Sequence, residues 1–418
     1  MSPIKNAEIL CVGTELLLGQ ITNTNAAWLA RELSLTGIHS YYQTVVGDNP
    51  ERLSAMLELA AGRSDLIILT GGLGPTQDDL TMAVAAQVAG LPLKLHEPSR
   101  AAIEHYFTQT GRRQITDNNW KQALMPDPSI VLPNHNGTAP GAIFEMRRGE
   151  KVCTLVLLPG PPSEMQLMFR ESVAPYLEQH TATRLRHCFV RLIGIGESAA
   201  ETRLLDLING QGNPTLASYA SEGEVMFRIT QSVVHDDDPD LTAAMLTEVK
   251  KRVGEFIYEI GPRTMPEVVY DLLLQRQETI GFAESCTGGL ISAQLTDLAG
   301  VSAVFRGSVV AYNNQVKTRI LHVSPDILAQ YGAVSAECAE AMAIGCRDVL
   351  GSDWAVSVTG IAGPDGGSAE KPIGLVFLAV AGPNGTMTKR LQLTGNRLRI
   401  RKVSALNAFD LLRRQLIP

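Results

Sequence analysis

The 418-residue sequence lacks the features that mark several common classes of protein. It has no apolar run of membrane-spanning length, and its first residues, Met-Ser-Pro-Ile-Lys-Asn, contain no apolar core of a secretion signal. The formal net charge is −7 and no basic, aromatic-rich surface stands out, so nucleic acid is not expected as a partner. We therefore expect a cytoplasmic protein that contacts neither membranes nor nucleic acid.

Cysteine is scarce and scattered. No two of the six cysteines form a Cys-x-x-Cys pair: Cys11, Cys153, Cys188, Cys286, Cys338 and Cys346. Neither a zinc site nor a disulfide framework is indicated, and most of the thiols are expected to be small core residues. The chain is too long for one core, and 45% hydrophobic residues are enough to bury two or three domains.

Residues 282–289 form the most informative stretch of the sequence. A strand expected at residues 280–283 leads into Ser285, Cys286 and Thr287, and Gly288 and Gly289 precede a helix expected at residues 290–295. Unpaired amides at the start of such a helix hold a developing oxyanion, and the glycines allow a substrate to approach. The alternative is structural, because Ser and Thr before a helix are ordinary N-caps.

Two later segments are expected at the same edge of a parallel sheet. A strand predicted to end at Tyr312 is followed by a helical turn with Lys317, and a further strand runs into a glycine-rich loop with Gly360, Ala362 and Gly363. Ligands of open parallel sheets bind where the strands end, and glycine loops approach phosphate or sugar closely. Taken singly, Tyr312 is an ordinary strand aromatic and Lys317 an ordinary surface lysine.

The last helix opens with Arg397, where the helix dipole favours anions, so Arg397 is a candidate for binding a phosphate. Arg401 lies four residues later on the same face, but this helix is basic throughout, and a solvated surface explains most of its cations equally well.

Cys286 is the rival of Ser285 as a nucleophile, since a thiolate is intrinsically stronger. Successive residues leaving a strand point in different directions, so only one of the two faces a substrate. No histidine lies near these motifs to pair with a thiol, the closest downstream being His322. The residues alone leave both choices open.

The first part of the chain predicts a doubly wound, mostly parallel sheet. Strands are expected at residues 9–13, 65–72 and 152–158, with helices at residues 23–37 and 163–178. The loops that follow the three strands, at Gly13, Gly71 and Pro159, are therefore expected to meet at one end of the sheet.

Asp78 and Asp79 lie in the second of these loops. Adjacent carboxylates beside glycine amides suit a divalent cation that bridges phosphate oxygens. They equally suit the first turn of the helix expected from Leu80, where acids complement the dipole. Glu15 in the first loop is a second acidic candidate.

The middle of the chain predicts a small α+β unit. Strands at residues 186–194 and 224–234 alternate with helices at residues 198–209 and 241–256. The acidic run 236–240 is more easily a turn than a calcium loop, because the ordered alternation of an EF-hand is missing. A spacer or dimerisation role is expected.

These motifs resemble the bacterial competence/damage-inducible protein A family over the whole chain. The segments that carry the resemblance are residues 12–20, Val-Gly-Thr-Glu-Leu-Leu-Leu-Gly-Gln; 70–79, Thr-Gly-Gly-Leu-Gly-Pro-Thr-Gln-Asp-Asp; 284–289, Glu-Ser-Cys-Thr-Gly-Gly; 312–317; 360–367, Gly-Ile-Ala-Gly-Pro-Asp-Gly-Gly; and Lys371-Pro372. The resemblance implies three α/β domains: a molybdopterin-binding-type domain over residues 1–172, a KH-like domain over 173–260 and a nicotinamide mononucleotide deamidase domain over 261–418. A homodimer is expected.

The resemblance also implies two activities. The first domain would hydrolyse ADP-ribose to AMP and ribose 5-phosphate with a divalent cation at Asp78 and Asp79, either Mg²⁺ or Co²⁺, with K⁺ as an additional option. Its substrate would be bound by the residues of the three loops: Gly13, Glu15, Gly71, Gly72, Gly74, Pro159 and Gly160. The alternatives are a non-catalytic module that binds a pterin or nucleotide, or a chain that acts as a partner protein in DNA uptake or recombination.

For the last domain the resemblance favours Ser285 as the nucleophile, with no cofactor. Ser285 is weak until a base takes its proton, and a neutral Lys317 in a partly dry pocket is such a base. Tyr312 is expected to hold Lys317 in place or relay the proton, and Thr287 with the amides that follow it to stabilise the oxyanion.

Overall fold

The computed structural model describes residues 3–111, 115–181, 184–210, 212–235 and 237–417. Two compact units divide the chain: one holds Met1–Arg186 with Ser232–Pro239, and the other His187–Gln231 with Asp240–Pro418. The predicted α/β class with three sheet-containing domains is confirmed, while the exact boundaries at residues 172 and 260 stay predictions. None of the described helices combines the length and apolar character that crossing a membrane requires.

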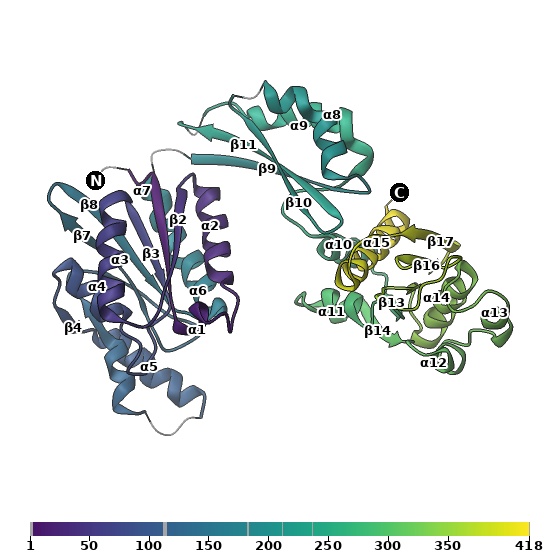
Figure 1. Ribbon diagram of the computed structural model, residues 1–418, viewed down its shortest axis with the longest axis horizontal. Coiled ribbons are helices and arrows are strands. Elements are labelled where there is room, and N and C mark those ends of the chain that lie inside the picture. Colours follow the sequence, from purple (N-terminus) through teal and green to yellow (C-terminus); the bar gives the residue numbers. More distant parts are fainter. Residues whose placement is uncertain (1–2, 112–114, 182–183, 211, 236, 418) are drawn as a thin grey trace. The chain divides into compact units, whose positions relative to one another are not determined.

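The N-terminal domain is built on a six-stranded sheet in the order β2-β1-β3-β8-β7-β6 (Figure 1). The strands are β1 (Asn6–Val12), β2 (His39–Val46), β3 (Leu66–Thr70), β6 (Ile130–Leu132), β7 (Gly141–Arg148) and β8 (Lys151–Leu158). The first four in this order run parallel, and β7 and β6 add an antiparallel edge. The prediction of a mostly parallel sheet is therefore confirmed.

Helices cover both faces of this sheet (Figure 1). One face carries α2 (Thr24–Thr36), α6 (Pro162–Met168) and α7 (Ala174–His180), and the other carries α3 (Pro50–Arg63) and α4 (Thr81–Ala89). The helix predicted at residues 163–178 is present as α6 and α7, joined by a π-helical turn at Phe169–Val173. Shorter elements complete the domain: α1 (Thr14–Leu17), β4 (Leu93–Leu95), α5 (Glu97–Gln109), a 3₁₀ helix (Asp117–Ala123) and β5 (Leu124–Pro126).

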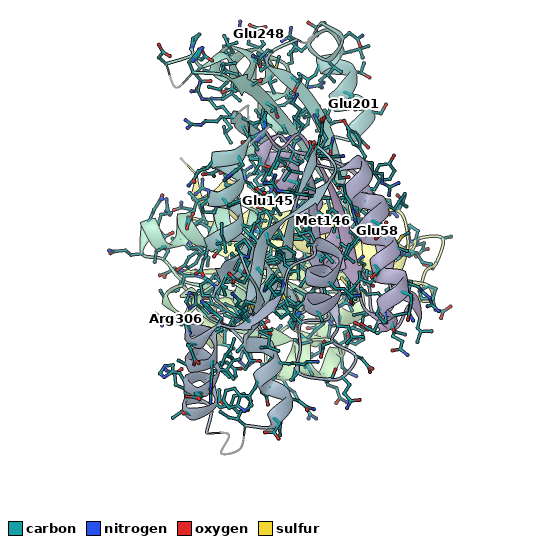
Figure 2. All side chains as sticks on the ribbon, turned by 90° about the vertical axis from the view of Figure 1, so that its left-hand side faces the viewer. Glu58, Glu145, Met146, Glu201, Glu248 and Arg306 are labelled. Atoms are coloured by element: carbon teal, nitrogen blue, oxygen red, sulfur yellow. The ribbon has the colours of Figure 1, made fainter. Side chains whose placement is uncertain are left out.

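Alternation along the strands divides the apolar side chains between two cores. Ile9 and Val156 pack on the face of Trp28, whereas Leu10 and Leu155 pack on the face of α3 and α4. The same alternation separates Met146, which is fully buried, from Glu145, which pairs with Arg147 at 3.1 Å (Figure 2).

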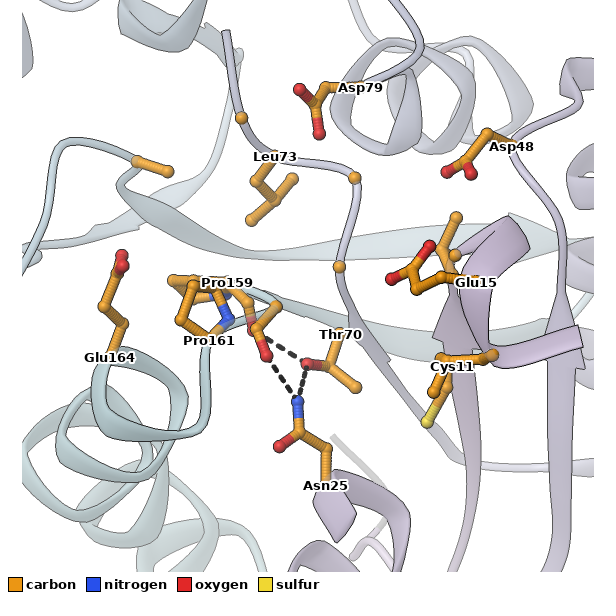
Figure 3. A pocket seen from close by; sticks show the side chains of 18 of the residues that line it. Cys11, Glu15, Asn25, Asp48, Thr70, Leu73, Asp79, Pro159, Pro161 and Glu164 are labelled. Atoms are coloured by element: carbon orange, nitrogen blue, oxygen red, sulfur yellow. Dashed lines mark hydrogen bonds between the residues drawn. The ribbon is translucent and has the colours of Figure 1, made fainter. Parts of the chain in front are cut away.

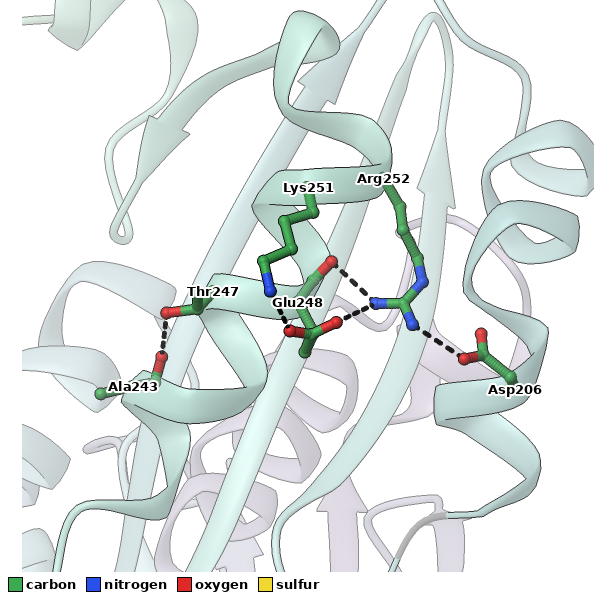
Figure 4. A network of polar contacts seen from close by, with 6 residues as sticks. All are labelled: Asp206, Ala243, Thr247, Glu248, Lys251 and Arg252. Atoms are coloured by element: carbon green, nitrogen blue, oxygen red, sulfur yellow. Dashed lines mark hydrogen bonds and ion pairs between the residues drawn. The ribbon is translucent and has the colours of Figure 1, made fainter.

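The middle domain is a four-stranded antiparallel sheet, β10-β11-β9-β12, with two helices. Its elements are β9 (Arg184–Ile193), α8 (Glu197–Asn209), β10 (Thr215–Ser221), β11 (Glu224–Val233), α9 (Leu241–Val253), a 3₁₀ turn (Gly254–Phe256) and β12 (Ile257–Ile260). Arg252 ties the two helices together, because its guanidinium binds Glu248 on α9 and Asp206 on α8 (Figure 4). The predicted acidic turn begins at Asp236, which lies outside the described residues.

The C-terminal domain contains a five-stranded sheet in the order β14-β13-β15-β16-β17. The strands are β13 (Ile280–Glu284), β14 (Phe305–Val310), β15 (Trp354–Gly360), β16 (Leu375–Gly382) and β17 (Gly385–Gln392). The helices are α10 (Met265–Arg276), α11 (Leu290–Thr296), α12 (Asn314–Arg319), α13 (Pro325–Gln330), α14 (Ala336–Leu350) and α15 (Arg397–Leu416), with a 3₁₀ turn at Val301–Ala303.

The first three of these strands are parallel, with Glu284 level with Val310 and Val358. Their carboxyl ends therefore meet at one edge of the sheet, where the predicted nucleophile, base and glycine loop begin.

Candidate active sites

A serine and a lysine meet at this edge of the C-terminal sheet. Lys317 Nζ lies 3.0 Å from Ser285 Oγ and donates to the carbonyl of Ala311 at 2.6 Å. Lys317 is only 1% exposed, and its burial lowers the pKa of the ammonium group. The lysine is therefore fixed beside the hydroxyl and biased toward the neutral form, which is able to accept a proton.

Glu284 holds the turn that carries Ser285. Its buried carboxylate accepts hydrogen bonds from the amides of Gly289, Ile291 and Ser292 at 2.9–3.1 Å and from the Ser292 hydroxyl at 2.6 Å. The N-terminus of α11 is thus satisfied by a carboxylate from the preceding strand. The N-cap alternative for Ser285 is wrong, because the N-cap position is Gly289 and no side chain at that position caps the helix.

The hydrogen bonds of the turn decide which amides remain free. Ser285 N–H donates to Val358, Gly288 N–H to Ser285 and Gly289 N–H to Glu284. The prediction that the amides following Thr287 face an oxyanion is therefore wrong. Within the described turn, the amides of Cys286 and Thr287 are left without an acceptor on another residue.

Thr287 itself is completely buried, and its hydroxyl has no partner among the described groups. Its carbonyl accepts from Arg401 of α15, at 3.2 Å from Nε and 2.6 Å from Nη2. Arg401, on the last helix, therefore supports the turn that carries Ser285. The sequence had suggested only a solvated surface for most cations of this helix.

Cys286 points away from this site into the hydrophobic core. Its side chain packs in the cluster that includes Phe282 and Ile291, and burial raises the pKa of its thiol to about 12. A thiol with this pKa is protonated at neutral pH, so the geometry favours Ser285 of the two rival nucleophiles.

The prediction that Tyr312 holds Lys317 in place is wrong, because Tyr312 forms no hydrogen bond with Lys317. The strand ends at Val310, so Ala311 turns inward to bind Lys317 and Tyr312 is 60% exposed. The Tyr312 hydroxyl instead accepts from Arg397 at 3.0 Å, and Arg397 also donates to the carbonyl of Gly363 at 2.8 Å. Of the predicted loop residues, Gly360 ends β15 opposite Val376, whereas Ala362 and Gly363 lie beyond the strand.

The N-terminal domain contains a cavity of about 610 Å³ at the carboxyl ends of its parallel strands (Figure 3). Every residue predicted to bind substrate or metal in this domain lines it: Gly13, Glu15, Gly71, Gly72, Gly74, Asp78, Asp79, Pro159 and Gly160. Gly71 and Gly72 have φ angles of 103° and 66°, so the tight loop after β3 depends on glycine. The predicted clustering of the three loops is confirmed.

The lining of this cavity is acidic. Five carboxylates face it and, among the described lining residues, there is no lysine or arginine; the acids are Glu15, Asp48, Asp78, Asp79 and Glu164. Asp79 accepts from the amide and hydroxyl of Thr76 at 2.8 and 2.7 Å. The helix-capping alternative for Asp79 is therefore wrong, since α4 starts after Leu80 with no acid in its first turn.

The carboxylates of this cavity fit a hard divalent cation that takes only some of its ligands from the protein. Asp78 and Glu15 have no partner among the described residues, and no three His, Cys, Asp or Glu side chains of the described chain gather to enclose an ion. Mg²⁺ keeps most of its water and binds through one or two carboxylates plus substrate phosphates, which is what this cavity offers.

Sequence models of three domain families match consecutive parts of the chain. They are described as "Probable molybdopterin binding domain" over residues 8–179, "Damage-inducible protein CinA KH domain" over 188–258 and "CinA C-terminal domain" over 262–416. A "CinA-like protein" from Dictyoglomus turgidum is 49% identical over 411 residues, 98% of this chain and 99% of the relative. The chain belongs to the CinA family.

A second relative and a solved structure are also similar to parts or all of this chain. A "CinA-like protein" from Kosmotoga olearia is 45% identical over 417 residues, 99% of each chain. Among solved structures, a "competence/damage inducible protein CihA" from Agrobacterium tumefaciens is 38% identical with a TM-score of 0.35, and the match covers 37% of this chain and 96% of that chain.

Several residues of the two CinA sites were not predicted. Glu284 begins the recognised motif 284–289 but was given no role, and Asp48 and Glu164 were not singled out from the sequence. The signal for Glu284 was an acid at the end of an otherwise apolar strand, because a carboxylate is buried only where donors surround it.

Proposed function

We propose that the C-terminal domain of this CinA-family chain hydrolyses nicotinamide mononucleotide to nicotinic acid mononucleotide and ammonia. The observation that carries the proposal is the buried Lys317 with a lowered pKa, 3.0 Å from Ser285 Oγ. A serine beside a base whose pKa is lowered toward neutrality is suited to attack an amide. The family resemblance, and not the geometry, narrows the amide to nicotinamide mononucleotide.

The reaction follows from the positions of these groups. Ser285 Oγ attacks the carboxamide carbon as Lys317 takes the hydroxyl proton, and Lys317 then gives a proton to the departing nitrogen, so that ammonia leaves. Water hydrolyses the resulting ester by the same exchange of protons and restores Ser285. Glu284 contributes by holding the turn, through four hydrogen bonds to α11.

The oxyanion and the phosphate need donors. We assign binding of the oxyanion to the amides of Cys286 and Thr287, which have no acceptor on another residue. We assign binding of the phosphate to Arg397, which stands at the start of α15 and donates to Tyr312 and Gly363. The two amides belong to the turn after β13 and Arg397 to the start of α15, so the substrate would span the edge of the sheet.

For the N-terminal domain we propose hydrolysis of ADP-ribose to AMP and ribose 5-phosphate. The supporting observation is a cavity of about 610 Å³ with glycine loops for a diphosphate and five carboxylates without a lining lysine or arginine. A diphosphate enters such a cavity only if cations offset its charge. Asp78 and Glu15 would hold a divalent cation, which would supply charge neutralisation at the diphosphate.

Both proposals are tested by measuring ammonia release from nicotinamide mononucleotide and AMP release from ADP-ribose, with and without chelator. We expect the chelator to stop AMP release and leave ammonia release unchanged, because the Ser285 site has no cluster of metal-binding side chains among the described residues. Equal loss of both activities would contradict this separation. Binding of ADP-ribose without turnover would instead support a non-catalytic N-terminal module.

Asp78→Asn is the matched variant, since it removes a charge at nearly constant volume. AMP release should fall by two or more orders of magnitude (~100-fold or greater) while the melting temperature stays within a few degrees of wild type, because Asp78 is exposed and forms no structural bond. Full turnover in saturating metal would show that Asp78 plays no part in the reaction.

A further inference from the structure

Glu164 is a carboxylate of the N-terminal cavity that the proposed chemistry leaves unused. It lies on α6, across the cavity from Glu15 and Asp48 (Figure 3). Asn134 Nδ2 donates to Glu164 Oε2 at 2.7 Å and to the carbonyl of Ala139 at 2.9 Å. The carboxylate is therefore anchored through one oxygen, and Oε1 has no partner among the described residues.

Glu164 is partly buried. Burial raises the pKa of its carboxyl group, and the side chain packs so closely on Gly137 that a β-carbon there would collide with it. A partly desolvated carboxylate gains from hydrogen-bond donors in the cavity. No lysine or arginine lines this cavity in the described chain, so Oε1 is left able to accept a hydrogen bond from a ligand.

The charge balance narrows the kind of donor. The proposed ligand, ADP-ribose, carries no ammonium group, and no group of three or more acidic, His or Cys side chains of the described chain gathers at Glu164 to hold a cation. Neutral donors of the ligand remain, which are the sugar hydroxyl groups and the adenine amine. Of these we choose the hydroxyl groups, because carboxylates that accept from ribose hydroxyls occur in nucleotide sites.

We propose that Glu164 binds the hydroxyl groups of the terminal ribose of the dinucleotide. The cavity then has two ends: one with Asp78 and the glycine loops for the cation and diphosphate, and one with Glu164 for the neutral sugar. This inference rests on the proposed ADP-ribose hydrolysis. It adds that recognition of the terminal ribose distinguishes ADP-ribose from nucleotides that lack this sugar.

The experiment compares wild type with Glu164→Gln. In the variant the new amide oxygen accepts from Asn134, which leaves an NH₂ group where the sugar hydroxyls need an acceptor. We expect KM for ADP-ribose to rise about 10-fold or more with little change in kcat, and the inhibition constant of ADP, which lacks the terminal ribose, to stay unchanged. The matched control is Glu171→Gln, which changes an exposed acid of the π-helical turn that follows α6.

Other compounds separate the possible contacts. ADP weakened by the same factor as ADP-ribose would overturn the proposal, because the contact would then lie on the shared nucleotide. Inosine diphosphate ribose, which lacks the adenine amine, should lose affinity like ADP-ribose; if it does not, Glu164 binds the base. No change in any constant would also overturn the assignment.

Calorimetric affinities keep this test independent of turnover. If wild type binds ADP-ribose without cleaving it, the hydrolysis proposal fails, and the same three ligands still show whether Glu164 selects the ribose. If wild type binds none of them, both proposals fail.

Discussion

Replacing Ser285 by alanine should reduce ammonia release from nicotinamide mononucleotide by ~1,000-fold or more. The substitution removes the only side-chain oxygen within hydrogen-bond distance of Lys317 Nζ in the described site and leaves the oxyanion amides in place. Transition-state binding by the remaining groups accounts for the residual activity. Ammonia release under single-turnover conditions measures the chemical step, and circular dichroism confirms folding.

Two neighbouring variants control for this result. Cys286→Ala should retain most activity, because its thiol is buried and its pKa is raised to about 12. Ser292→Ala removes a hydroxyl in the first turn of α11 that donates to Glu284 at 2.6 Å and forms no hydrogen bond with Lys317, so it too should retain most activity. An inactive Cys286→Ala with an active Ser285→Ala would reverse the assignment and make the site a thiolate enzyme.

Lys317→Met should lower deamidation to a level similar to that of Ser285→Ala. The alkyl chain of methionine fills the space of the lysine, but the hydroxyl proton of Ser285 loses its acceptor. Burial lowers the pKa of Lys317, so wild-type kcat/KM should rise with pH, with an apparent pKa below that of an ordinary lysine. This rise should vanish in the variant.

The matched control is Lys389→Met on β17. Burial also lowers the pKa of Lys389, whose Nζ binds Asn407 Oδ1 at 3.0 Å, yet β17 is separated from β13 by two strands. This variant should keep both the activity and the pH profile. Loss of the profile in Lys389→Met, or its survival in Lys317→Met, would show that Lys317 is not the base.

Some buried elements of the fold were predicted, whereas others, such as β7, α14 and β16, and the sheet edges were not. β3 is five apolar or Thr residues, all buried, and the helices α2 and α8 were predicted within about a residue of their observed ends. The edge strands β2 and β17 escaped prediction because most of their side chains are polar and exposed, so the pattern of a buried strand is absent.

In the sites, residue types were predictable but side-chain directions were not. The meeting of Ser285 with Lys317 depends on the register of β13 with β14 and on the turn into α12, which a linear sequence does not record. The same limit explains the error at Tyr312. The strand was expected to end at Tyr312 but ends two residues earlier, at Val310. As a result Ala311 faces inward and Tyr312 faces outward.

The burial of Lys317 also couples the stability of the fold to pH. An unfolded chain protonates this lysine up to a pH of about 10.4, whereas the folded chain releases the proton at its lowered pKa. Between these two values the unfolded state binds more protons, so the contribution of Lys317 to the free energy of unfolding rises with pH. Below the lowered pKa the cost of a buried ammonium group is fully present. The C-terminal domain thus gives up part of its stability at neutral pH to keep a base beside Ser285.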